Sequence, residues 1–167
     1  MRDWVVGGAV LLDDAGGVLL VENRRRNGAT DWTPPGGVIE VHEGESLLEG
    51  LGREVEEETG LRVTAWGGLL WSVTTAAPGL GWRLRAEVHL ATSWEGDLRV
   101  EDPDGIVVDA AFVRCDACAD HLDGVHPWVR EPLSLWLDER WEASASRPFD
   151  YRVDGEDLRT VVVTRVG

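Results

Sequence analysis

The sequence predicts an α/β fold, and three observations support this. Residues 82–92 alternate between apolar and polar side chains, as expected for a strand with one buried face. Residues 46–59 instead carry apolar side chains at helical spacing. The 167 residues, of which 43% are hydrophobic, are enough for one domain with its own core.

The chain opens with two apolar runs rich in β-branched residues, Trp4 to Leu12 and Val18 to Glu22. The segment between them, Asp13 to Gly17, contains two glycines, so we predict a β-hairpin. A basic loop follows, and then the residues 34–37 (Pro-Pro-Gly-Gly). The two prolines restrict φ, whereas the two glycines permit unusual backbone angles and close approach of the backbone. The backbone is therefore expected to be positioned tightly at this point.

The clearest helix begins after Ser46. Ser46 and Glu49 have the spacing of a capping box, and Gly60 stands where a left-handed C-terminal residue is expected. The interior glycines, Gly50 and Gly52, each cost roughly 1 kcal/mol relative to alanine. We therefore expect both glycines to allow close approach of the helix to a sheet.

The rest of the chain shows shorter patterns. We predict strands at residues 61–73, 82–92 and 107–113, and a second helix at residues 132–141. The tail contains two β-prone runs, 149–153 and 158–166, which are expected to form a C-terminal hairpin. We therefore divide the chain into a main domain, residues 1–147, and a hairpin extension of the same domain, residues 148–167.

The charge and composition exclude several classes of function. The formal net charge is −15 and the chain contains no lysine, so DNA or RNA would be repelled overall. We find no apolar stretch of the roughly 18 residues that a membrane span requires, and no secretory signal. With only two cysteines, the composition agrees with a cytoplasmic protein.

Three glutamates of the helix, Glu54, Glu57 and Glu58, fall on one face at about 100° per residue. Such like charges repel each other, and a hard divalent cation such as Mg²⁺ would compensate them. The alternative is a solvated acidic face on a protein that is acidic everywhere. The glycines at 36 and 37 and the arginine at 53 favour a site.

The stretch Gly36 to Leu61 resembles the Nudix box of the Nudix hydrolase family, G-x5-E-x7-R-E-U-x-E-E-x-G-U with U aliphatic. Residues Glu45 to Leu61 match this pattern position by position, and residues 32–37 resemble the W-x-x-P-G-G that commonly precedes the box. Seven residues separate Gly37 from Glu45, where the pattern has five. We place this insertion in the loop, because two extra helical residues would rotate the glutamate face by about 200°.

The resemblance implies a Nudix-type α/β/α sandwich with a mixed sheet, and Mg²⁺ or Mn²⁺ as the cofactor. It implies metal ligands at Glu54, Glu57, Glu58 and a carbonyl near Gly36. Arg53 is expected to orient a glutamate, and Glu45 to lie near the metal. Glu54 is our first choice as general base, and Glu45 or a loop carboxylate is the alternative.

The expected substrate is a small nucleotide-like molecule. We expect hydrolysis of the diphosphate linkage of a nucleoside diphosphate derivative, ADP-ribose-like or a nucleotide sugar, to a nucleoside monophosphate and a phosphorylated product. A nucleoside triphosphate, normal or oxidised, and a non-catalytic nucleotide-sensing module are the alternatives, and a homodimer stays open. The candidate substrate-binding residues are Arg24, Arg25, Arg26, Arg85, Trp32 and Asp104, with Trp71 and Trp82 as further candidates for a nucleobase pocket.

The sequence also contains four residues that could ligate zinc: Cys115, Cys118, His121 and His126. The spacing between Cys118 and His121 is tighter than usual for paired ligands. A buried, inert pair of cysteines is therefore the expectation.

Overall fold

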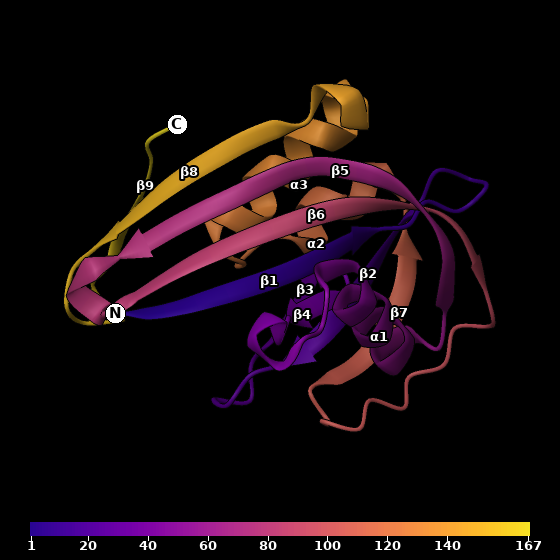
Figure 1. The fold of residues 1–167 in the computed structure, drawn as a ribbon, viewed down its shortest axis with the longest axis horizontal. Helices are drawn as coiled ribbons and strands as arrows, with labels where there is room; N and C mark the ends of the chain where they lie inside the picture. Colours follow the sequence, from indigo (N-terminus) through magenta and orange to yellow (C-terminus); the bar gives the residue numbers. More distant parts are fainter.

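The computed structural model describes residues 1–167, except for the side chain of His42. Figure 1 shows long curved strands with short helices on either side. The strands are β1 (Arg2–Val10), β2 (Val18–Arg24), β3 (Thr30–Thr33), β4 (Gly36–Val38), β5 (Arg62–Ala77), β6 (Trp82–Glu95), β7 (Val107–Val113), β8 (Arg147–Asp154) and β9 (Val162–Arg165). The α-helices are α1 (Leu47–Thr59), α2 (Cys118–His121) and α3 (Pro127–Glu139). Short 3₁₀ turns are η1 (Val41–Glu43), η2 (Pro78–Leu80), η3 (Cys115–Ala117) and η4 (Ala143–Ala145).

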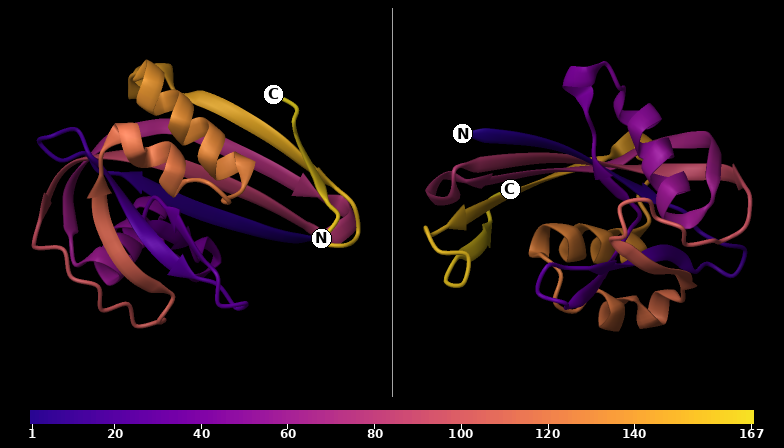
Figure 2. Two further views of the ribbon diagram at one scale, coloured as in Figure 1. Left: turned by 180° about the vertical axis from the view of Figure 1, so that it is seen from behind. Right: turned by 90° about the horizontal axis from the view of Figure 1, so that it is seen from below.

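The main sheet has six strands in the order β4-β1-β6-β5-β8-β9. It is mixed, because β1 pairs parallel to β6 and β5 parallel to β8, whereas the other neighbours are antiparallel. Helix α1 lies on one face of this sheet, and α2 and α3 lie on the other (Figure 2). The expected α/β/α sandwich with a mixed sheet is confirmed.

The predicted opening hairpin is wrong beyond its turn. Strands β1 and β2 are joined only near the turn, through the bridge between Leu12 and Val18 and a hydrogen bond from the Leu19 N–H to the Leu11 carbonyl. Strand β1 then continues in the main sheet, whereas β2 lies between β3 and β7 in a second, three-stranded sheet. Strand β1 is paired on both sides by segments distant from it in sequence, and β2 is paired by the nearby β3 and the distant β7, so β1 and β2 diverge.

Two hydrophobic cores hold the layers together. The first lies between the sheet and α3 and contains Trp71 from β5 and Trp136 from α3. Here the indole N–H of Trp141 donates to the Leu70 carbonyl at 2.6 Å, which satisfies a buried donor. The second core lies under α1 and includes Leu51 and Val55.

Helix α1 begins and ends as predicted. The Ser46 hydroxyl accepts a hydrogen bond from the Glu49 N–H at 3.2 Å, and Gly60 adopts φ of 80° at the C-terminus. A β-carbon at Gly50 would lie 2.5 Å from Glu45 Oε1, so this glycine permits close contact with the preceding loop rather than with a sheet. Gly52 faces open space, so the expectation of close packing there is wrong.

The long loop before α1 is accommodated without disturbing the helix. It contains the 3₁₀ turn η1, which ends at Gly44 with φ of 87°. The helix then starts directly after its cap, with the glutamates on one face. All seven residues between Gly37 and Glu45 therefore precede helix α1.

The C-terminal third differs in detail from the prediction. Helix α3 starts at Pro127 rather than Pro132, which lies inside the helix and removes one backbone donor. Strands β8 and β9 form the predicted hairpin, but β8 also extends the main sheet alongside β5. No helix of the described chain is long and apolar enough to cross a membrane.

Candidate active site

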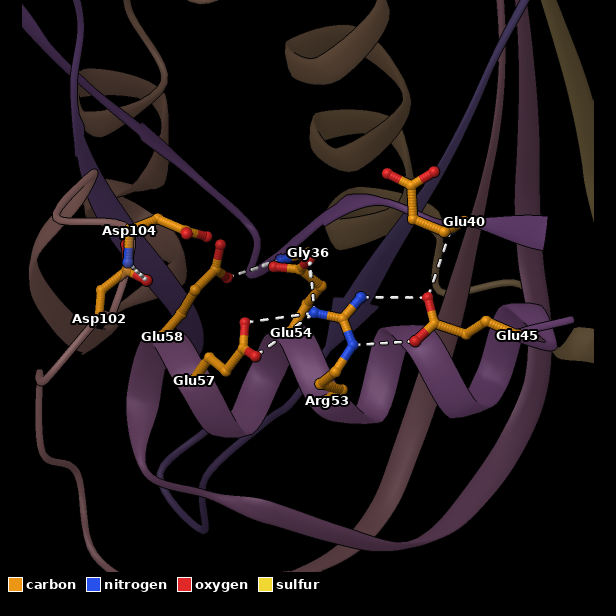
Figure 3. A network of polar contacts seen from close by, with 9 residues as sticks. All are labelled: Gly36, Glu40, Glu45, Arg53, Glu54, Glu57, Glu58, Asp102 and Asp104. Atoms are coloured by element: carbon orange, nitrogen blue, oxygen red, sulfur yellow. Dashed lines mark hydrogen bonds and ion pairs between the residues drawn. The ribbon is translucent and has the colours of Figure 1, made fainter. Parts of the chain in front are cut away.

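Helix α1 presents its acidic face toward β4 and the loop before β7. Figure 3 shows Glu54, Glu57 and Glu58 on this face, with Asp102 and Asp104 beside Glu58. Glu58 is only 7% exposed, whereas Glu54 and Glu57 are half-buried. The helix therefore brings the three predicted carboxylates together at the boundary between protein and solvent.

Arg53 links the carboxylates into one network (Figure 3). Its guanidinium binds Glu45 through two hydrogen bonds, Nε to Oε2 at 2.9 Å and Nη2 to Oε1 at 3.1 Å. Its Nη1 also lies 3.2 Å from Glu54 Oε1 and 3.3 Å from Glu57 Oε2. This geometry agrees with the expected orienting role, because one planar cation fixes three carboxylates at once.

Glu58 is the most perturbed carboxyl group of the site. Burial raises its pKa to about 8, and the neighbouring charges of Glu54, Asp102 and Glu57 act in the same direction. A hydrogen bond from the Gly36 N–H to Glu58 Oε2, 2.9 Å long, acts in the opposite direction. Burial also raises the pKa of Glu54, and the charge of Arg53 partly offsets this.

The glycines of β4 allow the helix and the sheet to approach closely. A β-carbon at Gly36 would lie 2.0 Å from the Gly7 carbonyl oxygen of β1. A β-carbon at Gly37 would lie 3.0 Å from Glu54 Cδ. Side chains at these positions would therefore displace either the edge strand or the glutamate.

The loop before β7 adds two further carboxylates. Asp104 shares a cleft with Glu45, Arg53 and Glu54, so this predicted residue reaches the acidic face. Asp102 accepts hydrogen bonds from the N–H groups of Ile106 and Val107 at 3.0 and 2.9 Å, which fixes the loop. Sequence analysis considered a carboxylate from this loop, but acidic turns occur throughout this chain and nothing local distinguished Asp102 from its neighbours.

A mostly apolar cavity of about 340 Å³ lies on the other side of β4. Its lining includes Gly36, Gly37, Asn23, Thr33, Trp71 and Trp128. Asn23 is 6% exposed and its amide nitrogen donates to Thr33 Oγ1 at 2.9 Å and to Asp31 Oδ1 at 3.2 Å. Sequence analysis missed Asn23 and Trp128; the only signal for Asn23 was a polar residue directly after a buried strand.

A protein-family model of the NUDIX domain matches residues 1–136. The chain belongs to the Nudix hydrolase family. A MutT-like protein from Streptomyces ambofaciens is 33% identical over 135 residues, which cover 75% of this chain and 80% of that protein. As a member of this family, the chain is a pyrophosphohydrolase that acts on acid anhydrides of phosphorus.

Solved structures of Nudix hydrolases share the fold. A MutT Nudix hydrolase from Burkholderia pseudomallei superposes with a TM-score of 0.62 at 27% identity, over 83% of this chain and 98% of that chain. A Nudix hydrolase from Nitrosomonas europaea gives a TM-score of 0.61 at 25% identity, over 88% and 93%. The C-terminal strand β9 lies beyond the residues that the family model matches.

The remaining predicted substrate-binding residues are dispersed. Arg25 lines the cavity and is held by Asp31, with both hydrogen bonds 2.7 Å long. Arg24, the last residue of β2, and Arg26, on the loop that follows, are both exposed. Arg85 follows Leu84, a cavity residue, on β6 and therefore points to the opposite face of the sheet.

Of the tryptophans expected near a nucleobase, Trp71 is buried and forms part of the cavity wall. Trp32 instead packs edge-on against His121, with ring centroids 5.2 Å apart. Trp82 lies in a neighbouring groove that contains Trp4 and Trp128.

The Nudix family generally depends on divalent metals, and the acidic face fits such an ion. Among the described side chains, no group of three acidic, histidine or cysteine residues is placed to hold a metal ion together. Mg²⁺ needs few protein ligands, however, because it keeps several of its own waters. The side chains of the acidic face offer only oxygen atoms, which are the ligands that a hard cation prefers. Such a cation would also offset the negative charges that, together with burial, raise the pKa of Glu58.

The four residues considered for zinc have other partners. Cys115 is exposed and its thiol contacts the Gly16 carbonyl at 3.0 Å, whereas Cys118 is buried. His121 Nδ1 lies 3.0 Å from the Ala117 carbonyl oxygen, and His126 stacks on Trp128. The expected buried pair is therefore half right, since only Cys118 is buried.

Proposed function

We propose that this Nudix hydrolase cleaves the diphosphate linkage of a nucleoside diphosphate derivative, with Mg²⁺ or Mn²⁺ held by Glu54, Glu57 and Glu58. The products would be a nucleoside monophosphate and a second phosphorylated compound. The observation that carries this proposal is the placement of the acidic face and the apolar cavity on opposite sides of the thin β4 strand. A base in the cavity and a diphosphate at the acidic face would thus belong to one substrate.

The cation would neutralise the diphosphate and acidify a water for attack on phosphorus. Glu58 is anchored by the Gly36 N–H, which fixes its carboxylate relative to β4. Arg53 restrains Glu54 and Glu57, so the ligands keep their orientation when a substrate binds. A carbonyl in the Gly36-Gly37 segment remains a proposed additional ligand.

Glu54 is the proposed general base. Its Oε1 accepts a hydrogen bond from Arg53, so Oε2 is the oxygen that would take a proton from the attacking water. Its raised pKa makes it a better proton acceptor than an exposed glutamate. Glu45 is a weaker candidate in this geometry, because both of its oxygens are bound by Arg53.

The apolar cavity would hold the nucleobase. The amide nitrogen of Asn23 is engaged by Thr33 and Asp31, so its carbonyl oxygen is the group that can accept a hydrogen bond from a base. Arg25, at the rim, is held in place by Asp31 and could contact a phosphate. Apolar walls with a few fixed polar groups are typical of small-molecule sites.

The decisive experiment is a hydrolysis panel in the presence of Mg²⁺, with ADP-ribose, nucleotide sugars, dinucleoside polyphosphates, and normal and oxidised nucleoside triphosphates. Glu57→Gln and Glu58→Gln should each lower kcat at least 100-fold. Glu56→Gln is the matched control, because it makes the same change on the exposed side of α1. Full activity in both test variants would show that the metal assignment is wrong.

The panel also separates the alternative functions. Release of pyrophosphate from nucleoside triphosphates, without cleavage of the diphosphate derivatives, would identify a nucleoside triphosphate pyrophosphohydrolase. Tight nucleotide binding with no turnover of any compound would identify a sensing module. The complete set of box glutamates at the acidic face supports an enzyme over a sensor.

A further inference from the structure

A second hollow of about 370 Å³, the aromatic groove, lies beside the proposed base cavity. Its walls are Trp4, Trp82, Trp128 and His126, over a floor formed by Val6 and Leu84. The groove and the cavity share Val6, Leu84 and Trp128, so they are two parts of one cleft along the α3 face of β1 and β6. Val38 of β4 lines both the aromatic groove and the acidic cleft that contains Glu54, so a group attached beyond a diphosphate at the acidic face can reach the groove.

Two of these tryptophans are not used to build the protein interior. Trp4 and Trp82 are half-buried and belong to neither of the two hydrophobic cores formed by the described residues. They stand near the N-terminal ends of adjacent parallel strands, where the register pairs Trp4 with Leu84. Such large apolar rings left at a surface commonly mark a binding site.

The rings form an organised platform rather than a loose cluster. Trp82 and Trp128 meet at 65° with centroids 6.2 Å apart, and His126 stacks on Trp128 at 4.1 Å and 8°. The Arg2 guanidinium lies 4.0 Å over the ring of Trp4 and adds positive charge at the outer end. Three elements, β1, β6 and α3, thus hold the rings in fixed positions.

We propose that the aromatic groove binds a second planar ring of the substrate, attached on the far side of the diphosphate. The inference rests on the proposed function and specifies it: the substrate would be a dinucleotide-like molecule with two base-bearing halves. A planar base suits the groove better than a sugar, because the side chains of its walls offer only indole N–H groups and one imidazole to hydroxyl groups. Stacking on tryptophan tolerates any base, since every base has a π face.

The test compares two compounds that share an adenosine diphosphate half and differ by one adenine, P1,P2-di(adenosine-5′) diphosphate and ADP-ribose. Dissociation constants are measured with Ca²⁺ in place of Mg²⁺, and kcat/KM with Mg²⁺. The wild type should favour the two-base compound by on the order of tenfold, the effect of stacking one base. Trp82→Leu should remove this preference while leaving ADP-ribose unaffected, and Trp82→Phe should keep most of it.

Equal affinity of the wild type for the two compounds would overturn the inference, whether or not either is hydrolysed. The inference would also be overturned if Trp82→Leu changed self-association, measured by sedimentation, but left the preference for the two-base compound unchanged. Trp4→Ala is the second variant, and Trp94→Ala controls for the loss of a tryptophan elsewhere, because Trp94 stacks on Phe112 outside the groove. Hydrolysis of ADP-ribose without a two-base preference would refute the groove and leave the proposed function standing.

Discussion

The buried carboxyl group of Glu58 gives a quantitative prediction for the metal-free protein. Burial raises its pKa from 4.5 to about 8, whereas in the unfolded chain the group titrates near 4.5. Between these values the folded state holds a proton that the unfolded state has lost. The contribution of Glu58 to the free energy of unfolding should therefore be largest below pH 4.5, and should fall as the pH rises toward 8.

The magnitude follows from the size of the pKa change. At about 1.4 kcal/mol for each pKa unit, the rise to about 8 corresponds to roughly 5 kcal/mol. This is comparable to the whole stability of many domains, which is about 5–15 kcal/mol. Mg²⁺ should restore stability mainly at high pH, because it binds the charged carboxylates of the folded state.

The assay is urea unfolding from pH 5 to 8.5 with EDTA, and then with Mg²⁺. Glu58→Gln should flatten the pH dependence and stabilise the metal-free protein at pH 8 by several kcal/mol, since the amide keeps the acceptor for the Gly36 N–H but carries no charge. Glu56→Gln, on the exposed side of the helix, should leave the slope unchanged. An unchanged slope in Glu58→Gln would refute the reasoning.

Further predictions concern the elements that position the site. Gly36→Ala places a β-carbon 2.0 Å from the Gly7 carbonyl oxygen, so it should lower the unfolding midpoint sharply; a wild-type midpoint would contradict the close packing of β4. Gly52→Ala adds a β-carbon that points into open space within α1. Because alanine favours a helix more than glycine does, this variant should stabilise the protein by up to about 1 kcal/mol in the same measurement. Ser46→Ala removes the helix cap and should cost about 1 kcal/mol, measured by urea unfolding. Arg53→Lys cannot reproduce the paired hydrogen bonds to carboxylates, so kcat should fall on the order of 100-fold with the fold intact by circular dichroism.

Sequence patterns were sufficient where the interactions are local. The cap at Ser46, the left-handed Gly60 and the spacing of Glu54, Glu57 and Glu58 all depend on residues within a few positions of each other. Helix α1 and its acidic face were therefore predicted correctly. The start of α3 was missed because Pro127 and Pro132 could each begin a helix, and the local sequence does not distinguish between them.

The second half of the site depends on pairing between distant segments, and the sequence does not contain a local signal for it. Asn23 on β2 and Trp128 on α3 are about a hundred residues apart, and the tertiary structure brings both to the lining of one cavity. A tryptophan in a chain with nine of them carries little information about position. The cavity and the aromatic groove were thus beyond prediction, although several of their residues had been considered.

The wrong hairpin and the missed cavity have one cause. A simple β1–β2 hairpin would place Val6 and Asn23 on neighbouring paired strands and leave no space between them. In the structure β1 is paired on both sides by β4 and β6, and β2 by β3 and β7, so the strands separate after the turn. The cavity lies between the separated strands, with Val6 on one wall and Asn23 on another. The non-local pairings that overrule the local hairpin signal are therefore the same ones that create the space proposed for the nucleobase.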